Sequence, residues 1–272
     1  MSATLASLHA YPLKSGAPLT LDAAKLEARG IAGDRRWMLV DANGRFVTGR
    51  QFARLPLVRA RPREDGALVV DAPGMPTIAV TPPAPEGERV ATAVWQAEVT
   101  PLLADAGAHA WFSRFLGVPV RLVHMDQRCD RRVVQMYEGR YGREEDRVSF
   151  ADAFPLLLVS QAALDQLNEK LAQPVPMLRF RPNLVIAGTA PHAEDGWRRI
   201  RIGAIEFDVV KACTRCVFTT VDFERGERDP SGEPLRTLTT YRRTPDGVTF
   251  GQNLIPRGTG ILRTGDPVEI LS

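Results

Sequence analysis

Residues 211–222 read KACTRCVFTTVD and place two cysteines, Cys213 and Cys216, three positions apart. The chain has 272 residues and three cysteines in all, so Cys129 is the only further thiol. A structural zinc site needs four ligands and an iron–sulfur cluster usually takes four cysteines. The four histidines show no His-x₃₋₅-His spacing that would complete a zinc site. The chain therefore lacks the further ligands that a structural zinc site or an iron–sulfur cluster would need beside this pair.

The residues around the pair narrow its chemistry further. Residues 204–210 (AIEFDVV) alternate apolar and acidic side chains, which predicts a half-buried strand leading into the cysteines. The β-branched run at residues 217–222 predicts another strand, whereas a redox-active Cys-x-x-Cys pair normally begins a helix. Two alternatives stay open. One thiolate, favoured by Arg215, acts as a single soft metal ligand, or both residues simply pack at a strand end.

The composition is that of an ordinary globular protein, with 44% hydrophobic and 25% charged residues. The formal net charge of +3 is too small to predict a nucleic-acid partner. No apolar run reaches the roughly 18–20 residues of a membrane helix, and the N-terminus lacks a secretory signal pattern. An odd number of cysteines makes no disulfide framework, so we expect a cytoplasmic location without a membrane partner.

The first half of the chain is rich in short strand patterns. Asn43-Gly44 lies between two β-prone runs within residues 37–48 and predicts a hairpin. Aromatic residues gather on one face of a predicted helix at residues 102–117, where they are expected to be core. Further strands are expected at residues 66–72 and 77–83, and an amphipathic helix capped by Ser160 at residues 160–171.

Residues 125–147 differ from their surroundings, because 12 of the 23 are Asp, Glu or Arg. The favoured interpretation is a solvated loop. The alternative is a mobile segment that borders a functional site. Cys129 lies in this segment without a partner by spacing, so no role is assigned to it.

An ordered series of motifs resembles one protein family. KACTRCVFTTVD, EPLRTLTTYR (233–242), FGQN (250–253) and GDPVEIL (265–271) together resemble the MOSC domain. Three earlier stretches resemble the N-terminal β-barrel domain that accompanies it, as in the mitochondrial amidoxime-reducing component and its bacterial counterparts. These are AYPLKS (10–15), GDRRWMLVD (33–41) and VTGRQ (47–51); SFADAFPLLLVS (149–160), RFRPNLVI (179–186) and AEDGWRRIRIG (193–203) match the segments between.

The resemblance implies a mixed α/β, β-rich fold. An N-terminal β-barrel-like domain would span residues 1–120, and a MOSC β-barrel domain with peripheral helices would span residues 121–272. Two departures from the family are visible. Gly16 stands where many relatives have cysteine, and Ala153 and Phe154 replace polar residues of some relatives.

The resemblance also implies a molybdenum cofactor, in which a pterin dithiolene (molybdopterin) holds the metal. In the family the second cysteine of the pair ligates molybdenum, which here is Cys216, and Cys213 would be a packing residue. Asp152 falls where the family has a carboxylate near the metal, so it would orient a water or pass a proton. Cations and polar groups would bind the rest of the cofactor. The matching positions are Lys14, Ser15, Arg35, Arg181, Asn183 and Arg215.

The implied activity is a molybdenum-dependent oxidoreductase that reduces small N-hydroxylated compounds, with oxygen transfer from N–OH to the metal. Electrons would come from a separate ferredoxin- or cytochrome-like donor system, because the chain lacks cluster cysteines and a G-x-G-x-x-G motif. A monomer is compatible with the sequence. The alternative is a cofactor carrier or sulfur-transfer protein with a persulfide on Cys216, and a third interpretation is a metal-free binding protein.

Overall fold

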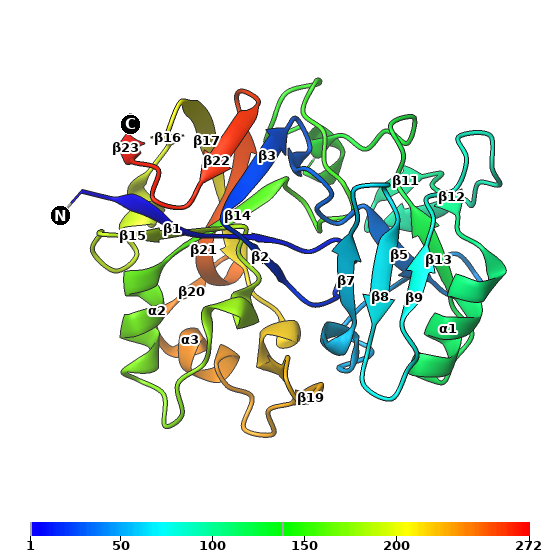
Figure 1. The fold of residues 1–272 in the computed structure, drawn as a ribbon. Helices are drawn as coiled ribbons and strands as arrows, with labels where there is room; N and C mark the ends of the chain where they lie inside the picture. The colour runs from blue at the N-terminus through cyan, green and yellow to red at the C-terminus, as the bar shows by residue number, and fades with distance from the viewer. Residues whose placement is uncertain (1, 138) are drawn as a thin grey trace.

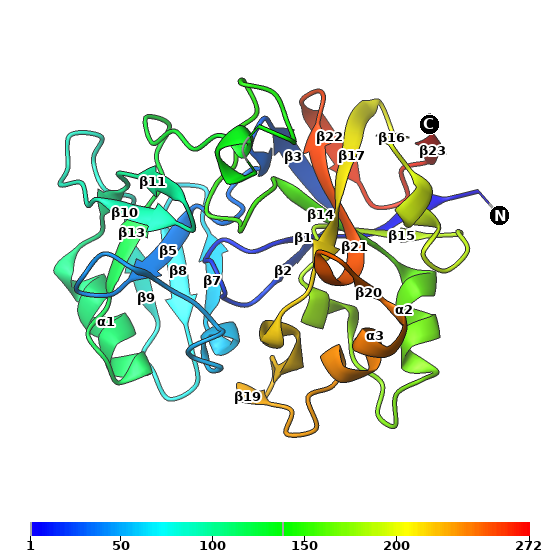
Figure 2. The same ribbon diagram turned by 180° about the vertical axis from the view of Figure 1, so that it is seen from behind.

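The computed structural model describes residues 2–137 and 139–272, and it folds into two halves that lie side by side (Figures 1 and 2). Within the described residues, the larger half is built on a sheet of nine strands. Its order is β2-β1-β15-β14-β21-β17-β16-β23, with β20 paired to β21. The strands are β1 (Thr4–Ala10), β2 (Leu19–Leu21), β14 (Leu156–Ser160), β15 (Leu184–Ala187), β16 (Arg199–Ile202), β17 (Ile205–Thr214), β20 (Arg243–Thr244), β21 (Gly247–Pro256) and β23 (Val268–Ile270).

The other half is made of three smaller sheets and the helix α1 (Ala106–Leu116). The orders are β12-β13-β5-β6, β7-β8-β9 and β10-β11. Their bounds are β5 (Trp37–Val40), β6 (Phe46–Val47), β7 (Arg59–Pro62), β8 (Leu68–Asp71), β9 (Ile78–Val80), β10 (Thr92–Val94), β11 (Ala97–Val99), β12 (Leu102–Leu103) and β13 (Arg121–His124).

Short elements complete the molecule. A small sheet has the order β22-β3-β4, and β18 pairs with β19. The strands are β3 (Ala23–Glu27), β4 (Gly30–Ile31), β18 (Val221–Asp222), β19 (Glu227–Arg228) and β22 (Gly260–Arg263); the α-helices are α2 (Gln161–Asn168) and α3 (Leu235–Tyr241); the 3₁₀ helices are η1 (Leu55–Leu57), η2 (Val133–Met136), η3 (Met177–Phe180), η4 (Ala193–Gly196) and η5 (Val217–Thr220). The expected β-rich mixed fold with peripheral helices is confirmed.

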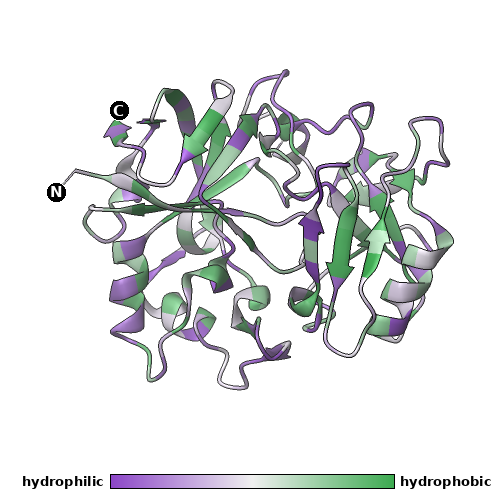
Figure 3. Cartoon of the chain, in the orientation of Figure 1, coloured by the Kyte–Doolittle hydropathy of each residue, from purple (hydrophilic) through white to green (hydrophobic). Residues whose placement is uncertain are grey.

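Each half has its own apolar core, and Figure 3 shows hydrophobic colour on the inner strands and hydrophilic colour on the outer face of α2. The chain nevertheless crosses between the halves. β1 pairs with β15, and β3 pairs with β22, so early strands belong to late sheets. β13, which begins at Arg121, pairs with β5. Strands on either side of residue 120 therefore pair with each other. The domain boundary expected at that residue stays a prediction.

The predicted hairpin and the two predicted helices are present. β5 and β6 pair antiparallel, and Gly44 in their turn has φ of 75°. The first helix begins at Ala106 rather than at residue 102, because residues 102–103 pair with β13 and the Asp105 side chain then accepts from the Ala108 N–H at 2.8 Å. Its aromatic residues Trp111, Phe112 and Phe115 are buried as expected. Ser160 caps α2 by accepting from the Ala163 N–H at 3.2 Å.

The prediction of a strand at residues 217–222 is wrong for most of that range. Residues 217–220 form η5, and only Val221 and Asp222 are in a strand. The hydroxyl of Thr219 donates to the Cys216 carbonyl at 2.9 Å, and that of Thr220 donates to the Val217 carbonyl at 2.8 Å. These local hydrogen bonds satisfy a turn and outweigh the β-propensity of the run.

Gly251 in β21 tests how tightly the central strands are packed. Its φ is 80°, and a Cβ there would lie 2.5 Å from the Leu158 carbonyl oxygen, whereas Gly74 has φ of 75° with open space around it. We expect Gly74→Ala to lower the free energy of unfolding by about 1 kcal/mol through backbone strain alone. Gly251→Ala should cost about 1–3 kcal/mol more because the neighbouring strand must move. Urea unfolding of both variants measures the difference, and equal losses would contradict the tight packing.

Candidate functional site

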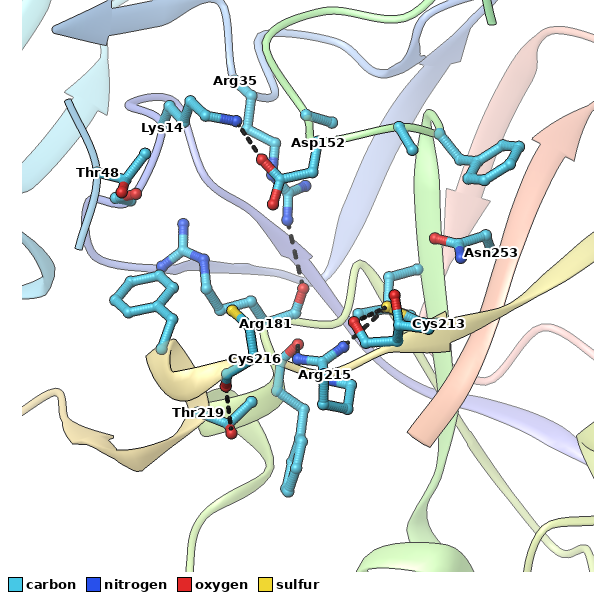
Figure 4. Close-up of a pocket in the computed structure, with 18 of the residues that line it drawn as sticks. Lys14, Arg35, Thr48, Asp152, Arg181, Cys213, Arg215, Cys216, Thr219 and Asn253 are labelled. Carbon is cyan, nitrogen blue, oxygen red and sulfur yellow. Dashed lines mark hydrogen bonds and ion pairs between the residues drawn. The ribbon is translucent and has the colours of Figure 1, made fainter. Parts of the chain in front are cut away.

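A pocket of about 720 Å³ takes its lining from both halves of the molecule (Figure 4). It is bordered by the loops after β1, β6 and β10, by the segment before β14, and by the end of β17 with η5. Every residue predicted for the site lines this pocket. They are Lys14, Ser15, Arg35, Asp152, Arg181, Asn183, Arg215 and Cys216. Residues up to about 200 positions apart in the sequence are thus brought together, while their individual roles stay predictions.

Lys14 and Asp152 form an ion pair in the pocket. The ammonium of Lys14 lies 2.6 Å from Asp152 Oδ1 and also donates to the Phe150 carbonyl at 2.6 Å. Lys14 is buried, whereas the Asp152 side chain is 53% exposed and faces the open pocket. Burial lowers the pKa of Lys14 to about 8, although the charge of Asp152 opposes this. Desolvation alone would raise the pKa of Asp152, but Lys14 and Arg50 together hold it below its usual value.

Arg50 is a second cation on Asp152 that the sequence analysis did not assign. Its Nη1 lies 3.2 Å from Asp152 Oδ2, so the two carboxylate oxygens have separate cationic partners. Arg50 belongs to the VTGRQ stretch, and this was the only feature of the sequence that could have indicated a role for Arg50 in the site. The arrangement keeps Asp152 ionised at neutral pH.

Arg131 was also missed, and it is an exception within residues 125–147, where most of the charged side chains are exposed as expected of a solvated loop. Its side chain is completely buried. The guanidinium donates to three carbonyls of one segment: Ser149 at 2.7 Å, Ala151 at 2.5 Å and Asp152 at 2.8 Å. A charged group is tolerated there because the carbonyls satisfy it. The segment borders the pocket, as the alternative interpretation had it, and Arg131 fixes the backbone that presents Asp152.

Tyr11 holds two of the predicted arginines. Its ring is fully buried, with the Arg35 guanidinium 4.5 Å from the ring centroid and that of Arg181 at 4.0 Å. Both arginines have left-handed backbones, with φ of 48° and 56°. Arg35 donates to Asp34 at 2.5 Å and Arg181 to the Gly16 carbonyl at 2.6 Å. Burial lowers the pKa of Arg181 to about 10, which still leaves it charged at neutral pH.

Asn183 serves as a connector at the floor of the pocket. Its Oδ1 accepts from Arg35 Nη1 at 3.0 Å and from the Leu157 N–H at 3.2 Å. Its Nδ2 donates to the His9 carbonyl at 3.0 Å. The amide therefore links β1, β14 and Arg35 by hydrogen bonds. The sequence had predicted only a cofactor-binding role for Asn183 and not this structural one.

The two cysteines have different surroundings. Cys216 is exposed, and its thiol points into the pocket, while Cys213 is half-buried at the end of β17 (Figure 4). Arg215 does not lie against Cys216. Its Nη1 donates to Cys213 Sγ at 3.0 Å and its Nη2 donates to the Phe180 carbonyl at 2.6 Å. Cys213 thus has a polar partner besides its packing contacts. Arg215 is next to Cys216 in the sequence, but its guanidinium contacts Cys213 instead.

Three arginines leave hydrogen-bonding capacity beside the pocket. Arg179, Arg181 and Arg215 each have one buried guanidinium nitrogen without a hydrogen-bond partner among the described residues. Buried cationic donors of this kind cost stability unless an anion or polar ligand satisfies them. Within residues 2–137 and 139–272, no three His, Cys, Asp or Glu side chains gather to hold a metal ion.

The two family departures lie in the same region. The carbonyl of Gly16 is the acceptor for Arg181, and a Cβ on Gly16 would approach Leu13 at 3.0 Å. Ala153 and Phe154 line the pocket, and the Phe154 ring stacks on Tyr137 with centroids 5.7 Å apart. Ala153 and Phe154 therefore make one wall of the pocket apolar, whereas Gly16 acts on the pocket through Arg181.

Comparison with known proteins gives the family. The MOSC N-terminal beta barrel domain matches residues 2–119, and the MOSC domain matches residues 145–269. The chain is 35% identical to mitochondrial amidoxime-reducing component 1 of Mus musculus, over 98% of this chain and 82% of the relative. The chain belongs to this family of MOSC-domain proteins.

Other relatives of this MOSC-domain protein give the same picture. The human mitochondrial amidoxime-reducing component 1 is 32% identical over 98% of this chain and 83% of its own length. The Xenopus laevis protein of the same name is 32% identical over 95% of this chain and 79% of its own length.

Among the described residues, no helix is both long and apolar enough to cross a membrane.

The buried amine of Lys14 predicts a pH effect on stability. Its pKa is about 8 in the folded protein against 10.5 for the ordinary side chain, so between these values the unfolded chain binds more protons. The free energy of unfolding therefore gains from this group as pH rises from about 8 to 10.5. Relative to Lys14→Met, wild type should gain up to about 3 kcal/mol over this interval, as measured by denaturant unfolding. The exposed Lys25→Met variant is the control, and a flat difference for Lys14→Met would contradict the perturbed amine.

Proposed function

We propose that this MOSC-domain protein binds a molybdenum cofactor in the pocket and reduces small N-hydroxylated compounds to the corresponding N–H products. The family supports the proposal, because the relatives are named amidoxime-reducing components. The observation that carries it for this chain is the pocket itself. An exposed thiol, a carboxylate held by two cations and three arginines with unused donors line one cavity.

The residues present fit an anionic pterin cofactor. Arg179, Arg181 and Arg215 offer donors to phosphate or to the polar edge of a pterin, and an arginine can grip phosphate with two parallel hydrogen bonds. Lys14, from the loop between β1 and β2, and Arg35, from the loop between β4 and β5, add positive charge to the same pocket. Cys216 offers one soft ligand, which suits a metal whose remaining ligands come from the cofactor.

The bound cofactor would supply the two-electron chemistry and accept the substrate oxygen, while the chain positions the substrate and handles its protons. Asp152, ionised at neutral pH, would accept hydrogen bonds from the N–H and O–H groups of the substrate. Lys14 would supply a proton through this contact, because its pKa of about 8 is close to the working pH. Arg131 keeps the carboxylate in place through the backbone.

We further propose a cytoplasmic location and a separate electron-donor protein. The three cysteines of the chain are fewer than the four thiolates that usually hold an iron–sulfur cluster. The alternative function is a cofactor carrier or sulfur-transfer protein, and the exposure of Cys216 favours it as a second candidate, since a persulfide there would be accessible. Reduction of benzamidoxime by purified, molybdenum-loaded protein with a chemical electron donor separates the two functions.

The assignment of Cys216 predicts a selective loss. Cys216→Ala should lower molybdenum-dependent reduction by at least about 100-fold, because replacement of a ligand should cost no less than loss of an outer-sphere partner. Cys129→Ala is the matched control, since Cys129 is buried in an apolar cluster outside the pocket. Metal content by mass spectrometry and turnover are measured together. Full activity of Cys216→Ala would show that the ligand assignment is wrong.

The cationic part of the pocket makes a separate prediction. Arg181→Gln should reduce the pterin retained after purification about tenfold, because a buried charge-assisted hydrogen bond is lost. Arg114→Gln removes an exposed arginine on α1 and should retain wild-type cofactor. Fluorescence of the released, oxidised pterin gives the content per chain. Equal retention in both variants would place the cofactor elsewhere.

A further inference from the structure

Trp95 occupies an unusual place at the edge of the pocket. It lies in the two-residue turn between β10 and β11, where Val94 pairs with Ala97. Its φ is 58°, a left-handed value that such turns normally assign to glycine and that is costly for a bulky side chain. The side chain is nevertheless 50% exposed. Neither backbone preference nor core packing explains a tryptophan at this position.

The ring of Trp95 belongs to a stack that ends at the candidate catalytic carboxylate. The Arg50 guanidinium lies 4.8 Å from the Trp95 ring centroid and 5.9 Å from that of Phe46. Phe46 and Trp95 meet edge to face, with centroids 5.4 Å apart. The other end of the same guanidinium lies 3.2 Å from Asp152. Arg50 therefore links an exposed aromatic surface directly to the group proposed to contact the substrate.

Two of these residues also border two neighbouring cavities. Thr48, Arg50 and Trp95 line both the cofactor pocket and a neighbouring cavity of about 780 Å³ between the β5–β6 and β10–β11 hairpins. The neighbouring cavity has an apolar lining that includes Phe46, Ala93 and Val99. Asp152 lines the cofactor pocket, so an organic group would lie along Thr48, Arg50 and Trp95, which border both cavities, and a flat ring there would lie against the Trp95 side chain.

We propose that Trp95, with Arg50 and Phe46, forms an aromatic platform that binds the planar aromatic body of the substrate, so that its N–OH group reaches Asp152. This inference rests on the proposed function and narrows its substrate class to aryl N-hydroxylated compounds. Offset stacking on tryptophan adds attraction beyond the burial of area, and the guanidinium already held flat by Asp152 can stack on a second ring. A short alkyl substrate gains neither contact.

The test compares benzamidoxime with acetamidoxime, which carry the same N–OH group on an aromatic and on a methyl body. Trp95→Ala should raise the KM for benzamidoxime about five- to tenfold with kcat nearly unchanged, and leave both constants for acetamidoxime unchanged. Trp95→Phe should restore most of the preference for benzamidoxime over acetamidoxime.

Two further variants are controls. Trp95→Gly relieves the strain of the left-handed backbone and should unfold no more easily than wild type, so it separates loss of the ring from a folding defect. Ile261→Ala, which shortens another side chain that is 51% exposed, is the control.

Binding is also measured without turnover. Benzamidoxime should quench a fluorescence component that is present in wild type and absent in Trp95→Phe, and acetamidoxime should not. Equal effects of Trp95→Ala on the two substrates, or no effect on either, would overturn the platform. So would a defect seen only with a protein electron donor, because Trp95 would then be a docking residue. If wild type reduces neither compound the proposed function fails, and the quenching experiment alone decides whether the platform exists.

Discussion

The contact on which the site depends is the ion pair between Lys14 and Asp152, which joins segments 138 residues apart. An ammonium as deeply buried as that of Lys14 is unfavourable unless a carboxylate and a carbonyl accept its hydrogen bonds. Asp152 can fill that role because Arg131, buried beneath it, holds the carbonyls of residues 149, 151 and 152. The buried amine of Lys14 is therefore held in place by the segment that precedes β14.

The rest of the pocket follows from the same constraint. A cavity between two cores is lined by loops, and the cations in those loops need partners to be retained there. Tyr11 supplies an aromatic face for Arg35 and Arg181, and Asn183 links Arg35 to two strands. These contacts fix Arg35 and Arg181, while Arg179, Arg181 and Arg215 each keep one donor unused, which is the arrangement expected of a site that binds an anionic cofactor.

Much of the local structure could be predicted, since it depends on contacts between sequence neighbours. The Asn43-Gly44 hairpin, the cap of α2 at Ser160 and the buried aromatic face of α1 all follow from turn chemistry, capping and periodicity. The segment after Cys216 was mispredicted because threonine hydroxyls there bond to the local backbone. The resemblance to MOSC-domain proteins selected eight residues that do line one pocket, although it gave no distances between them.

The sequence by itself determined the β-rich class, the family and the set of residues able to serve a soft metal and an anionic cofactor. Only the tertiary structure decided which of them touch. It placed Arg215 on Cys213 instead of Cys216, gave Asp152 a second cation in Arg50, and buried Arg131 from a segment that seemed solvated. The reason is physical: a charge is matched to its partner through space, and pairs such as Arg50 and Asp152 lie 102 residues apart, where no periodicity or spacing rule can connect them.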